Sequence, residues 1–532
     1  MKKFFRTGQP YIWLTAGTLT ICLLMICGLI VLIMANGFGM FWPRKIVKLT
    51  LRDNTTVLGE IMKRESIPHR QDSYRMNMKV GNRDVYGMDF RWIDDSDIVS
   101  QEYPVTALAL ERREWGNMYC FLKGLKQGDD VKSISKEELA VLVKENKALF
   151  RKIRRIGKKE IGDINYKMEK CRLELKRLAS LQYSEKVQER IFKAELKMGN
   201  LEKEFLEKEE TLQRLYATAR EKEAVFVLAD NREKILPVFQ IVRLCAPNEM
   251  GVFTKTGFYI AKVWEFISGE PREANTEGGI FPAIFGTVMM VLIMSIAVVP
   301  LGVITAVYLR EYSSDNIIAR IVRISVSNLA GVPSIVFGIF GLGFFIYFVG
   351  GGIDKLFFSE ALPTPTYGTG GILWASLTLA LLTVPVVVVA TEEGLSSVPM
   401  SIREGAYALG ATKFEMLWKV VIPQATPGIL TGAILAMSRA VGEVAPLMIT
   451  GVVKLAPSLP IDGHFPFIHL ERKFMHLGFH IYDVGFQSPN VEAAIPMVYT
   501  TTLVLLFIVL ALNLAAIIVR NKLKRRYSAT TL

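Results

Sequence analysis

Two oppositely charged residues, Arg439 and Glu443, lie within an apolar segment at residues 429–451. An ionised side chain costs several kcal/mol in hydrocarbon, so such residues mark a path for an ion or polar solute by default. Their spacing of four places them on one helical face, where they can pair. A guanidinium offers a permanently charged fork for an oxyanion, and the carboxylate would compete with that anion so that it leaves again. The alternative is a structural ion pair that joins this helix to a neighbour.

A polar, basic segment precedes this span at residues 403–428, with the sequence REGAYALGATKFEMLWKVVIPQATPG. Seven apolar residues recur at helical spacing: Ile402, Ala406, Leu409, Phe414, Leu417, Trp418 and Val421. Gly410 allows a backbone turn between two helices, and Pro423 is expected to end the second helix. The pattern predicts an amphipathic helix-turn-helix that presents apolar side chains to a partner. An interfacial segment that rests on lipid is the alternative.

The composition places both features in a membrane protein. The chain has 532 residues, of which 51% are hydrophobic and 22% charged. Most of the charge falls between residues 44 and 275, so we expect a polytopic membrane protein with one large water-soluble insertion. The excess positive charge is interleaved with Glu in helical segments, which argues against nucleic-acid binding.

Six apolar segments are long enough to span a bilayer, which takes about 20 residues. We expect spans at residues 11–35, 280–309, 324–350, 371–391, 429–451 and 493–519. The first is expected to be an uncleaved anchor, because it is long for a signal peptide and no good cleavage site follows. The basic residues beside the spans fall on one side, which the positive-inside rule assigns to the cytoplasm. They are Lys2, Lys3, Arg6, Arg310, Arg320, Arg323, Arg403, Lys413, Lys419, Arg520, Lys522, Lys524, Arg525 and Arg526.

The insertion is predicted to combine β-structure with a long helical hairpin. Residues 44–105 alternate around Asp-Asn and Gly-Asn turns, as β-hairpins do. Residues 224–247 return to this pattern, as if completing the same sheet. Between them, two apolar heptad seams predict an antiparallel coiled coil over about 134–222. The coiled coil is either an arm that reaches a partner or a self-contained spacer. The seams comprise Ile164, Met168, Cys171, Leu175 and Leu178 in the first arm, and Val187, Ile191, Ala194, Met198, Leu201, Phe205, Leu212 and Leu215 in the second.

The spacing within the polar segment resembles the EAA loop of ABC importer permeases. The matching residues are Glu404, Gly410, Val420, Ile422 and Pro423, with Gly405 before Ala406 where the family usually has two alanines. Three further stretches are similar to the A-type permease subunit of the Pst phosphate importer: GGIFPAIFGTV (278–288), GVPSIVFGIFGLG (331–343) and RAVGEVAPLM (439–448). The resemblance covers roughly residues 275–525, and the insertion looks like that of the long form of this subunit.

The resemblance implies a phosphate importer subunit in a bacterial inner membrane. This chain would form half of the pathway, with Arg439 and Glu443 along it and the loop coupled to an ATPase. The implied partners are a second, C-type permease subunit, a dimer of ATP-binding subunits, a periplasmic phosphate-binding protein and membrane lipid. The sequence has no G-x-x-x-x-G-K-[ST] loop, so ATP hydrolysis is expected in a partner chain, with no enzymatic activity and no cofactor here. The alternatives are a permease for sulfate or molybdate, and a membrane-anchored coiled-coil sensor or scaffold.

These inferences define the expected architecture: a mainly α, polytopic helical bundle with an extracytoplasmic β and coiled-coil insertion. The expected parts are an anchor at 1–36, a periplasmic domain at 37–275, a permease domain at 276–522 and a tail at 523–532, with both termini cytoplasmic. Six His and acidic residues gather before the last span: His464, His469, Glu471, His476, His480 and Asp483. Their spacing is unlike that of metal ligands, so no metal site is expected.

Overall fold

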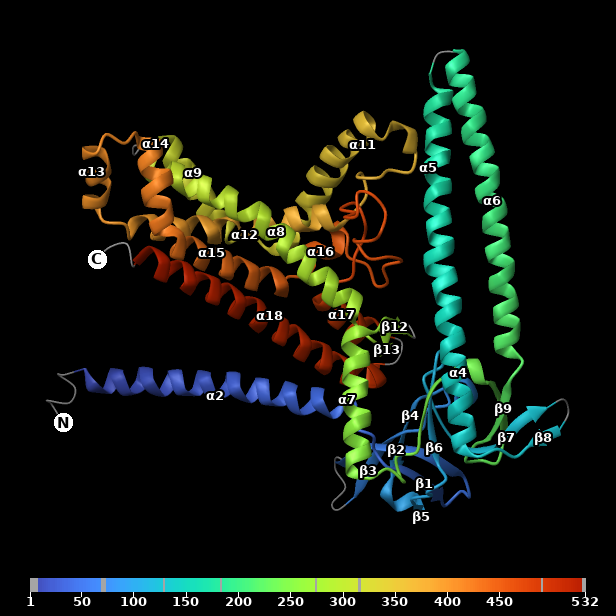
Figure 1. The fold of residues 1–532 in the computed structure, drawn as a ribbon. Helices are drawn as coiled ribbons and strands as arrows, with labels where there is room; N and C mark the ends of the chain where they lie inside the picture. Colours follow the sequence, from blue (N-terminus) through green and yellow to red (C-terminus); the bar gives the residue numbers. More distant parts are fainter. Residues whose placement is uncertain are drawn as a thin grey trace. The chain divides into compact units, whose positions relative to one another are not determined.

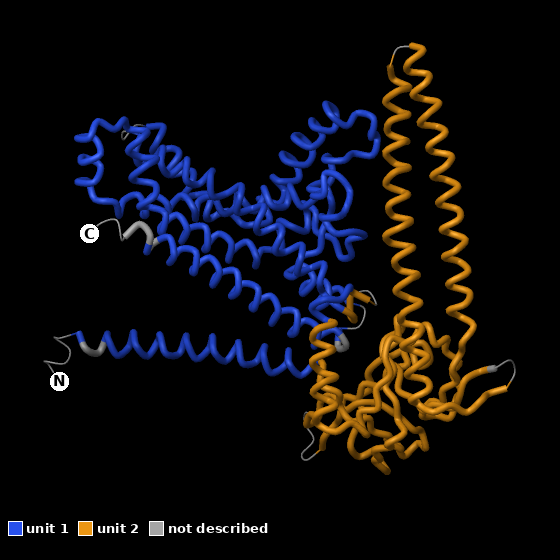
Figure 2. Tube along the Cα trace, in the orientation of Figure 1, with its two compact units in different colours: residues 1–40, 266–270, 279–532 blue, residues 41–265, 271–278 orange. Residues whose placement is uncertain are grey.

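The computed structural model describes residues 8–67, 73–127, 130–181, 184–272, 275–313, 317–488 and 491–528. The chain divides into two compact units (Figure 2). Unit 1 comprises residues 1–40, 266–270 and 279–532, and unit 2 comprises residues 41–265 and 271–278. Lys2, Lys3 and Arg6, on which the predicted orientation partly rests, lie outside the described residues, as does the end of the tail at 529–532.

Unit 1 consists mainly of apolar helices (Figure 1). Among the described residues, six stretches are long and apolar enough to cross a membrane: Tyr11–Gly39, Phe281–Tyr312, Ser334–Phe357, Ile372–Ser396, Lys413–Gly442 and Ala494–Leu523. The helices are α2 (Gln9–Gly39), α8 (Phe281–Val307), α9 (Ile317–Leu329), α10 (Ser334–Phe340), α11 (Gly351–Phe357), α12 (Ile372–Ser396), α13 (Met400–Ala408), α14 (Lys413–Met416), α15 (Ile422–Gly442), α16 (Ala445–Thr450), α17 (Leu477–Tyr482) and α18 (Val491–Ser528). Six spans were predicted, and six are present.

Helix α12 is the centre of the bundle and packs against α8 on one side and α15 on another. Glycines allow these close approaches, as is common between membrane helices. A Cβ atom added at Gly302 of α8 would lie 2.5 Å from Val387 of α12, and one at Gly428 of α15 would lie 2.6 Å from the Cα atom of Gly394 of α12. Larger side chains at either position would therefore push the helices apart.

The third and fifth spans differ from their predicted positions. The third begins at Ser334 instead of residue 324, because α9 ends at Leu329 and the backbone turns where Gly331 N–H donates to the Asn328 carbonyl. The fifth covers residues 413–442 instead of 429–451. It ends early because Glu443 has extended backbone, with φ −80° and ψ 130°, before α16 begins.

Unit 2 holds two antiparallel sheets at the base of a helical hairpin. The five-stranded sheet has the order β4-β3-β2-β1-β5, and the six-stranded sheet has β10-β9-β7-β6-β11 with β8 on β7. The strands are β1 (Ile46–Leu51), β2 (Thr56–Ser66), β3 (Tyr74–Lys79), β4 (Phe90–Asp94), β5 (Ile98–Glu102), β6 (Leu108–Arg112), β7 (Asn117–Gln127), β8 (Asp130–Lys132), β9 (Glu223–Val227), β10 (Glu233–Pro237) and β11 (Ile241–Cys245). Helix α3 (Arg83–Tyr86) links β3 to β4. Strand β12 (Pro271–Arg272) pairs with β13 (Glu277–Gly278).

The predicted strands after the hairpin are present, but they join a different sheet from the one expected. Strands β9 and β10 extend the sheet of β7, and β11 pairs with β6. The sequence did not reveal β6 and β7, because Trp115 and Gly116, both with positive φ, interrupt a short alternation there. Buried Leu110, Met118 and Phe226 form part of the core of this second sheet.

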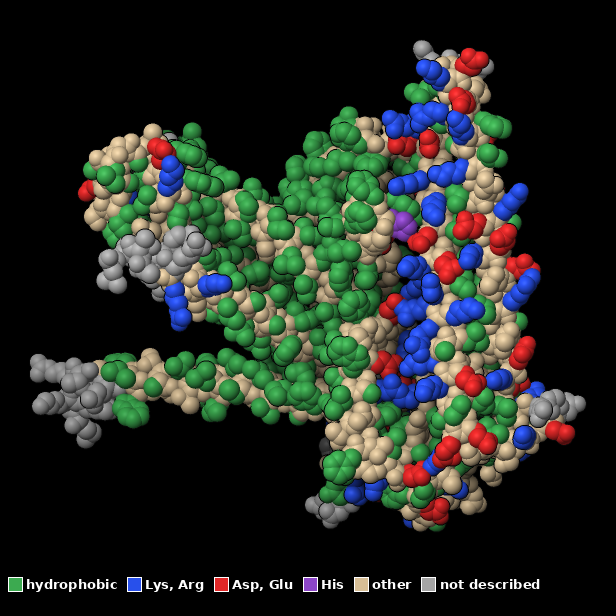
Figure 3. Space-filling view, viewed as in Figure 1, with side chains coloured by type: hydrophobic (Ala, Val, Ile, Leu, Met, Phe, Trp, Pro, Cys, Tyr) green, Lys and Arg blue, Asp and Glu red, His purple; other side chains and the backbone are tan. Residues whose placement is uncertain are grey.

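The predicted helical hairpin is present between β8 and β9 (Figure 1). Its first arm consists of α4 (Lys136–Arg154), a π-helical stretch and α5 (Ile161–Ala179), and its second arm is α6 (Glu185–Arg220). The arms run antiparallel, since Arg190 pairs with Glu174 near the turn and Lys208 pairs with Glu160 nearer the base. At 1.5 Å per residue, α6 is about 54 Å long. Figure 3 shows Lys, Arg, Asp and Glu side chains along the hairpin, whereas hydrophobic side chains cover the helices of unit 1.

Candidate functional site

Arg439 and Glu443 meet where helix α15 ends. Arg439 lies in the last turn of α15, and Glu443 is the first residue after it. The Nε atom of Arg439 lies 3.5 Å from Oε1 of Glu443, and the side chains are 34% and 22% exposed. Within the described part of the chain, Glu443 is the one ion-pair partner of this guanidinium, so most of its five N–H donors are left for solvent or a solute.

The predicted pairing is therefore present, but its setting differs from the prediction. The pair bridges a helix end instead of lying on one face of a continuous helix, and Arg439 is near the end of the span instead of about ten residues into it. The break is held by close packing on both sides. A Cβ atom at Gly338 of α10 would lie 2.8 Å from Pro446 Cα, and one at Gly478 of α17 would lie 2.7 Å from a methyl group of Val444. Irregular backbone at membrane depth occurs where it is buried in protein or lines a water-filled path.

Several polar residues near the last span were not predicted as neighbours. His476 and His480 are buried, and Nδ1 of His476 accepts from Gly478 N–H at the start of α17. Buried Asp483 pairs with Lys454 at 3.1 Å. The sequence placed both histidines in an external loop, and no local pattern indicated that the loop folds back into the bundle. The described residues include no group of three or more His, Cys, Asp or Glu side chains that would suit a metal ion.

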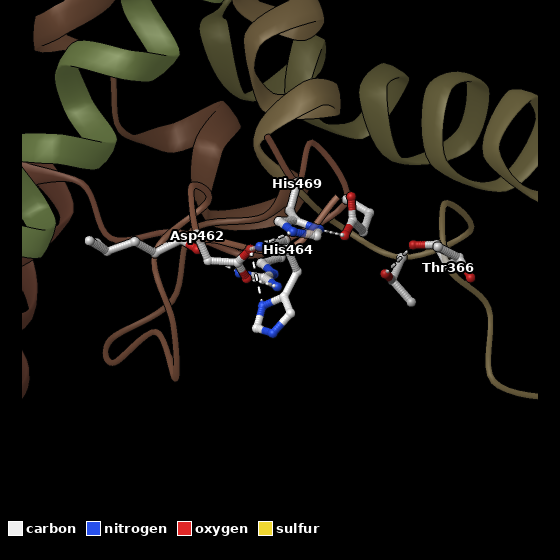
Figure 4. A network of polar contacts seen from close by, with 8 residues as sticks. Thr366, Asp462, His464 and His469 are labelled. Atoms are coloured by element: carbon white, nitrogen blue, oxygen red, sulfur yellow. Dashed lines mark hydrogen bonds and ion pairs between the residues drawn. The ribbon is translucent and has the colours of Figure 1, made fainter. Parts of the chain in front are cut away.

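A second polar network fixes the loop between α16 and α17 (Figure 4). His469 lies between two carboxylates, with Nε2 3.0 Å from Asp462 and Nδ1 3.0 Å from Glu471. Asp462 also accepts from the backbone N–H of His464 and pairs with Arg472. Burial on its own raises the pKa of Asp462, but these donors outweigh it and lower the pKa to about 2. The carboxylate therefore stays charged and holds the loop together.

The polar segment forms the predicted pair of short helices, α13 and α14. Gly410 separates them with φ +82°, a left-handed conformation that favours glycine. Thr412 then caps α14 by accepting from the N–H of Glu415, whose side chain accepts from the N–H of Thr412 in return. Pro423 does not end the second helix as predicted. The backbone is helical without a break from Lys413 to Gly442, and a π-helical turn at residues 417–421 lies directly before Pro423, so the proline is inside a continuous helix.

An ion pair clamps this segment to the membrane helices. Arg403 of α13 binds Glu311 at the end of the second span at 2.9 Å, and it donates to the carbonyl groups of Val398 and Leu395. Ala406 is buried, and Val420 and Ile422 pack in the same cluster. The segment is therefore a rigid extension of the bundle.

The outer surface of the same segment carries three exposed apolar side chains. Leu409, at the tip, is 91% exposed, and Phe414 and Trp418 are 66% and 64% exposed. The two aromatic rings stack with centroids 6.3 Å apart. Glu404 and Gly405 of the EAA-like motif are also exposed. Exposed, rigidly held apolar side chains of this kind mark an interaction surface.

Part of unit 1 is similar to known proteins. The family model for the inner membrane component of binding-protein-dependent transport systems matches residues 298–529. The phosphate transport system permease protein PstA of Mycobacterium leprae is 36% identical over 203 residues, which are 38% of this chain and 61% of that protein. The corresponding PstA 1 protein of Mycobacterium tuberculosis is 34% identical over 250 residues, which are 47% of this chain and 73% of that protein. The chain belongs to this family of importer permeases.

The permease also matches the solved inward-facing structure of the MetNI methionine ABC transporter, with 18% identity, a TM-score of 0.35 and coverage of 49% of this chain and 98% of that one. The family match contains Arg439, Glu443 and the whole of the 403–423 segment. It confirms the resemblance to ABC importer permeases that the EAA-like spacing indicated. All of unit 2 precedes the matched residues.

Proposed function

We propose that this permease is one of the two membrane subunits of an ATP-driven phosphate importer. Phosphate crosses beside Arg439, and the 403–423 segment couples the helices to a separate ATPase. The partners are a second permease chain, a dimer of ATP-binding subunits and a phosphate-binding protein on the outer side. ATP is used by the ATPase, and this chain binds no cofactor of its own.

The substrate proposal rests on the position, the exposure and the ion pairing of Arg439. Its guanidinium lies at a helix break in an apolar span, is about one third exposed and has Glu443 as its ion-pair partner among the described residues. A divalent or monovalent phosphate matches the bidentate geometry of such a group. Competition from Glu443 weakens anion binding, which transport requires because a tightly held ion is not released. The names of the relatives from the two mycobacteria support phosphate as the anion.

The proposed orientation places the coupling segment and both termini in the cytoplasm, in a bacterial inner membrane. Arg310, Arg403, Lys413, Lys419 and Arg520 lie on described loops or helix ends that alternate with the spans as the positive-inside rule requires. Residues 37–275 then lie in the periplasm.

The test is uptake of radiolabelled phosphate by cells that carry the permease with its partner subunits. Arg439→Gln removes the charge, and we expect uptake to fall by ten- to a hundredfold, because a hydrogen bond to a charged group contributes about 1.5–3 kcal/mol. Arg323→Gln is the matched control, since it removes another ion pair of unit 1 with the same 3.5 Å separation, to Glu392. It should leave uptake within about twofold.

Competition with unlabelled anions separates the substrate alternatives. Excess phosphate should suppress uptake of the label, whereas sulfate and molybdate should not. If sulfate or molybdate is transported in place of phosphate, the proposal of phosphate as the substrate is wrong, whereas the proposal that the chain is a permease still holds. Normal phosphate uptake by Arg439→Gln, with the protein present at its usual level, would show that the ion pair is structural.

A further inference from the structure

Helix α7 (Val252–Ser268) has the reverse of the amphipathic pattern expected for a helix on a water-soluble domain. Its outward face carries Phe253, Ile260, Trp264 and Ile267, which are 95%, 62%, 70% and 38% exposed. The spacing of seven, four and three residues keeps these side chains on one stripe of the helix. Gly257, Ala261 and Thr256 lie beside these residues and are also exposed, and the hydroxyl of Thr256 donates to the carbonyl of Val252 within the helix.

All three charged residues of α7 lie on the opposite face, toward unit 2. Lys255 donates to the carbonyl of Pro43, Lys262 pairs with Glu111, and Glu265 pairs with Arg243. Each charge is therefore satisfied inside the domain, and the exposed face carries large apolar side chains together with the uncharged Thr254 and Thr256. In water this arrangement exposes hydrophobic surface at a cost. It is the arrangement expected when the medium outside is hydrocarbon.

Helix α7 contacts the chain just after the first span and just before the second. Helix α2 ends at Gly39, and the next aromatic residues, Phe41 and Trp42, pack against Tyr259 of α7 with ring centroids 6.5 and 6.1 Å away. At the other end of α7, the carbonyl of Phe266 accepts from the N–H of Ile280, immediately before α8 begins at Phe281. Aromatic residues at the ends of spans are typical of the membrane–water interface.

We propose that the apolar face of α7, defined by Phe253, Ile260, Trp264 and Ile267, docks on the lipid of the membrane surface. Unit 2 is thereby seated on the bilayer by a helix whose hydrophobic side chains enter the acyl region at the headgroup boundary. The proposal does not depend on which anion the permease carries.

Site-specific photo-cross-linking in intact cells tests this contact in the full-length chain. Benzoylphenylalanine is placed at Phe253, Ile260 or Trp264, the cells are irradiated, and the purified chain is weighed by mass spectrometry. We expect adducts whose added mass is that of a membrane phospholipid, at Ile260 and Trp264 above all. Phe192 of α6 is the matched control, because it is an exposed aromatic residue of the same unit, 67% exposed, on the hairpin.

The outcomes separate the three occupants of this face. Phospholipid adducts at α7 that exceed those at Phe192 at least fivefold support the proposal. Adducts to another polypeptide at α7, or no adduct beyond the control, would overturn it in favour of a protein partner or of water. Because the substituted residues are exposed, we expect each variant to elute from size-exclusion chromatography like the unsubstituted chain. A variant that does not is replaced by the same substitution at Ile267, on the same face.

Discussion

The carboxylate of Asp462 contacts three residues of its own loop, and its negative charge strengthens each of these interactions. It accepts from the N–H of His464 at 2.8 Å and contacts His469 and Arg472. These contacts lower its pKa from the ordinary 3.8 to about 2. Since the folded-state pKa is depressed, the stabilisation is complete above about pH 4 and is lost as the pH falls through 2.

The substitution Asp462→Asn tests this assignment. It keeps the shape of the side chain but removes the charge, so we expect a loss of about 1–3 kcal/mol of stability at pH 7. Thermal unfolding in detergent measures the difference in stability between the unsubstituted chain and the Asp462→Asn chain. This difference in stability should become smaller as the pH falls from 4 toward 2. Asp130→Asn, on the exposed strand β8, is the control. A difference that does not change with pH would rule out the charge as the cause.

Single residues also show where reasoning from sequence stops. The spacing of Arg439 and Glu443 was enough to predict that they pair. It was not enough to predict the helix break between them, which depends on Pro446 and Val444 packing against glycines of α10 and α17. The burial of His476 and His480 has the same origin. Contacts between segments more than thirty residues apart leave no local pattern.

At the scale of elements, the local structure of the 403–423 segment was predicted well because its signals are local. Gly410 and the Thr412–Glu415 capping box act within one turn. Pro423 was expected to end a helix, because it has no N–H and its ring clashes with the preceding turn. The helix instead continues through it after a π-helical turn in which Leu417 and Val421 are buried against the bundle. Tertiary packing therefore outweighs the tendency of proline to end a helix.

Leu409→Asp tests whether the apolar tip of this segment is a docking surface. An unpaired carboxylate in an apolar groove costs about 3–5 kcal/mol, so we expect co-purification of the ATP-binding subunit to weaken by a hundredfold or more. Stability should hardly change, because Leu409 is 91% exposed. Leu196→Asp on α6 is the matched control at 59% exposure. Full retention of the ATPase by Leu409→Asp would contradict the coupling role.

At the scale of the whole molecule, the sequence predicted six apolar spans and a region that combines β-strands with two long helical arms, and the described residues contain both. The sequence did not predict which strands of the insertion pair with one another. Phe226 of β9 lies opposite Leu122 of β7, about a hundred residues earlier in the chain. Alternation predicts that a strand exists, but its partner is chosen by packing between distant segments.

The hairpin can be shortened without disturbing the sheets. The activity of such a shortened chain distinguishes a transport function from a scaffold function. Leu139 and Val143 of α4 are buried in the core of the second sheet, so the base of the hairpin has to be kept. Gly157 and Leu212 face each other across the arms, since a Cβ atom at Gly157 would lie 3.9 Å from Leu212. Residues 158–211 can therefore be replaced by a loop of about four residues, which spans the 8–10 Å between packed helices.

This truncation removes the outer part of both arms and leaves the spans, Arg439 and the coupling segment intact. If the chain works mainly as a permease, phosphate uptake by the truncated chain should stay within about threefold of the full-length chain. If the hairpin is the working part of a sensor or scaffold, the function should be lost although the chain still reaches the membrane. The control is a hairpin of full length in which residues 158–211 are kept but exposed Leu196 and Leu206 are changed to Ser. Loss of uptake in the truncated chain alone would show that the reach of the arm, and not its surface chemistry at these positions, is required for transport.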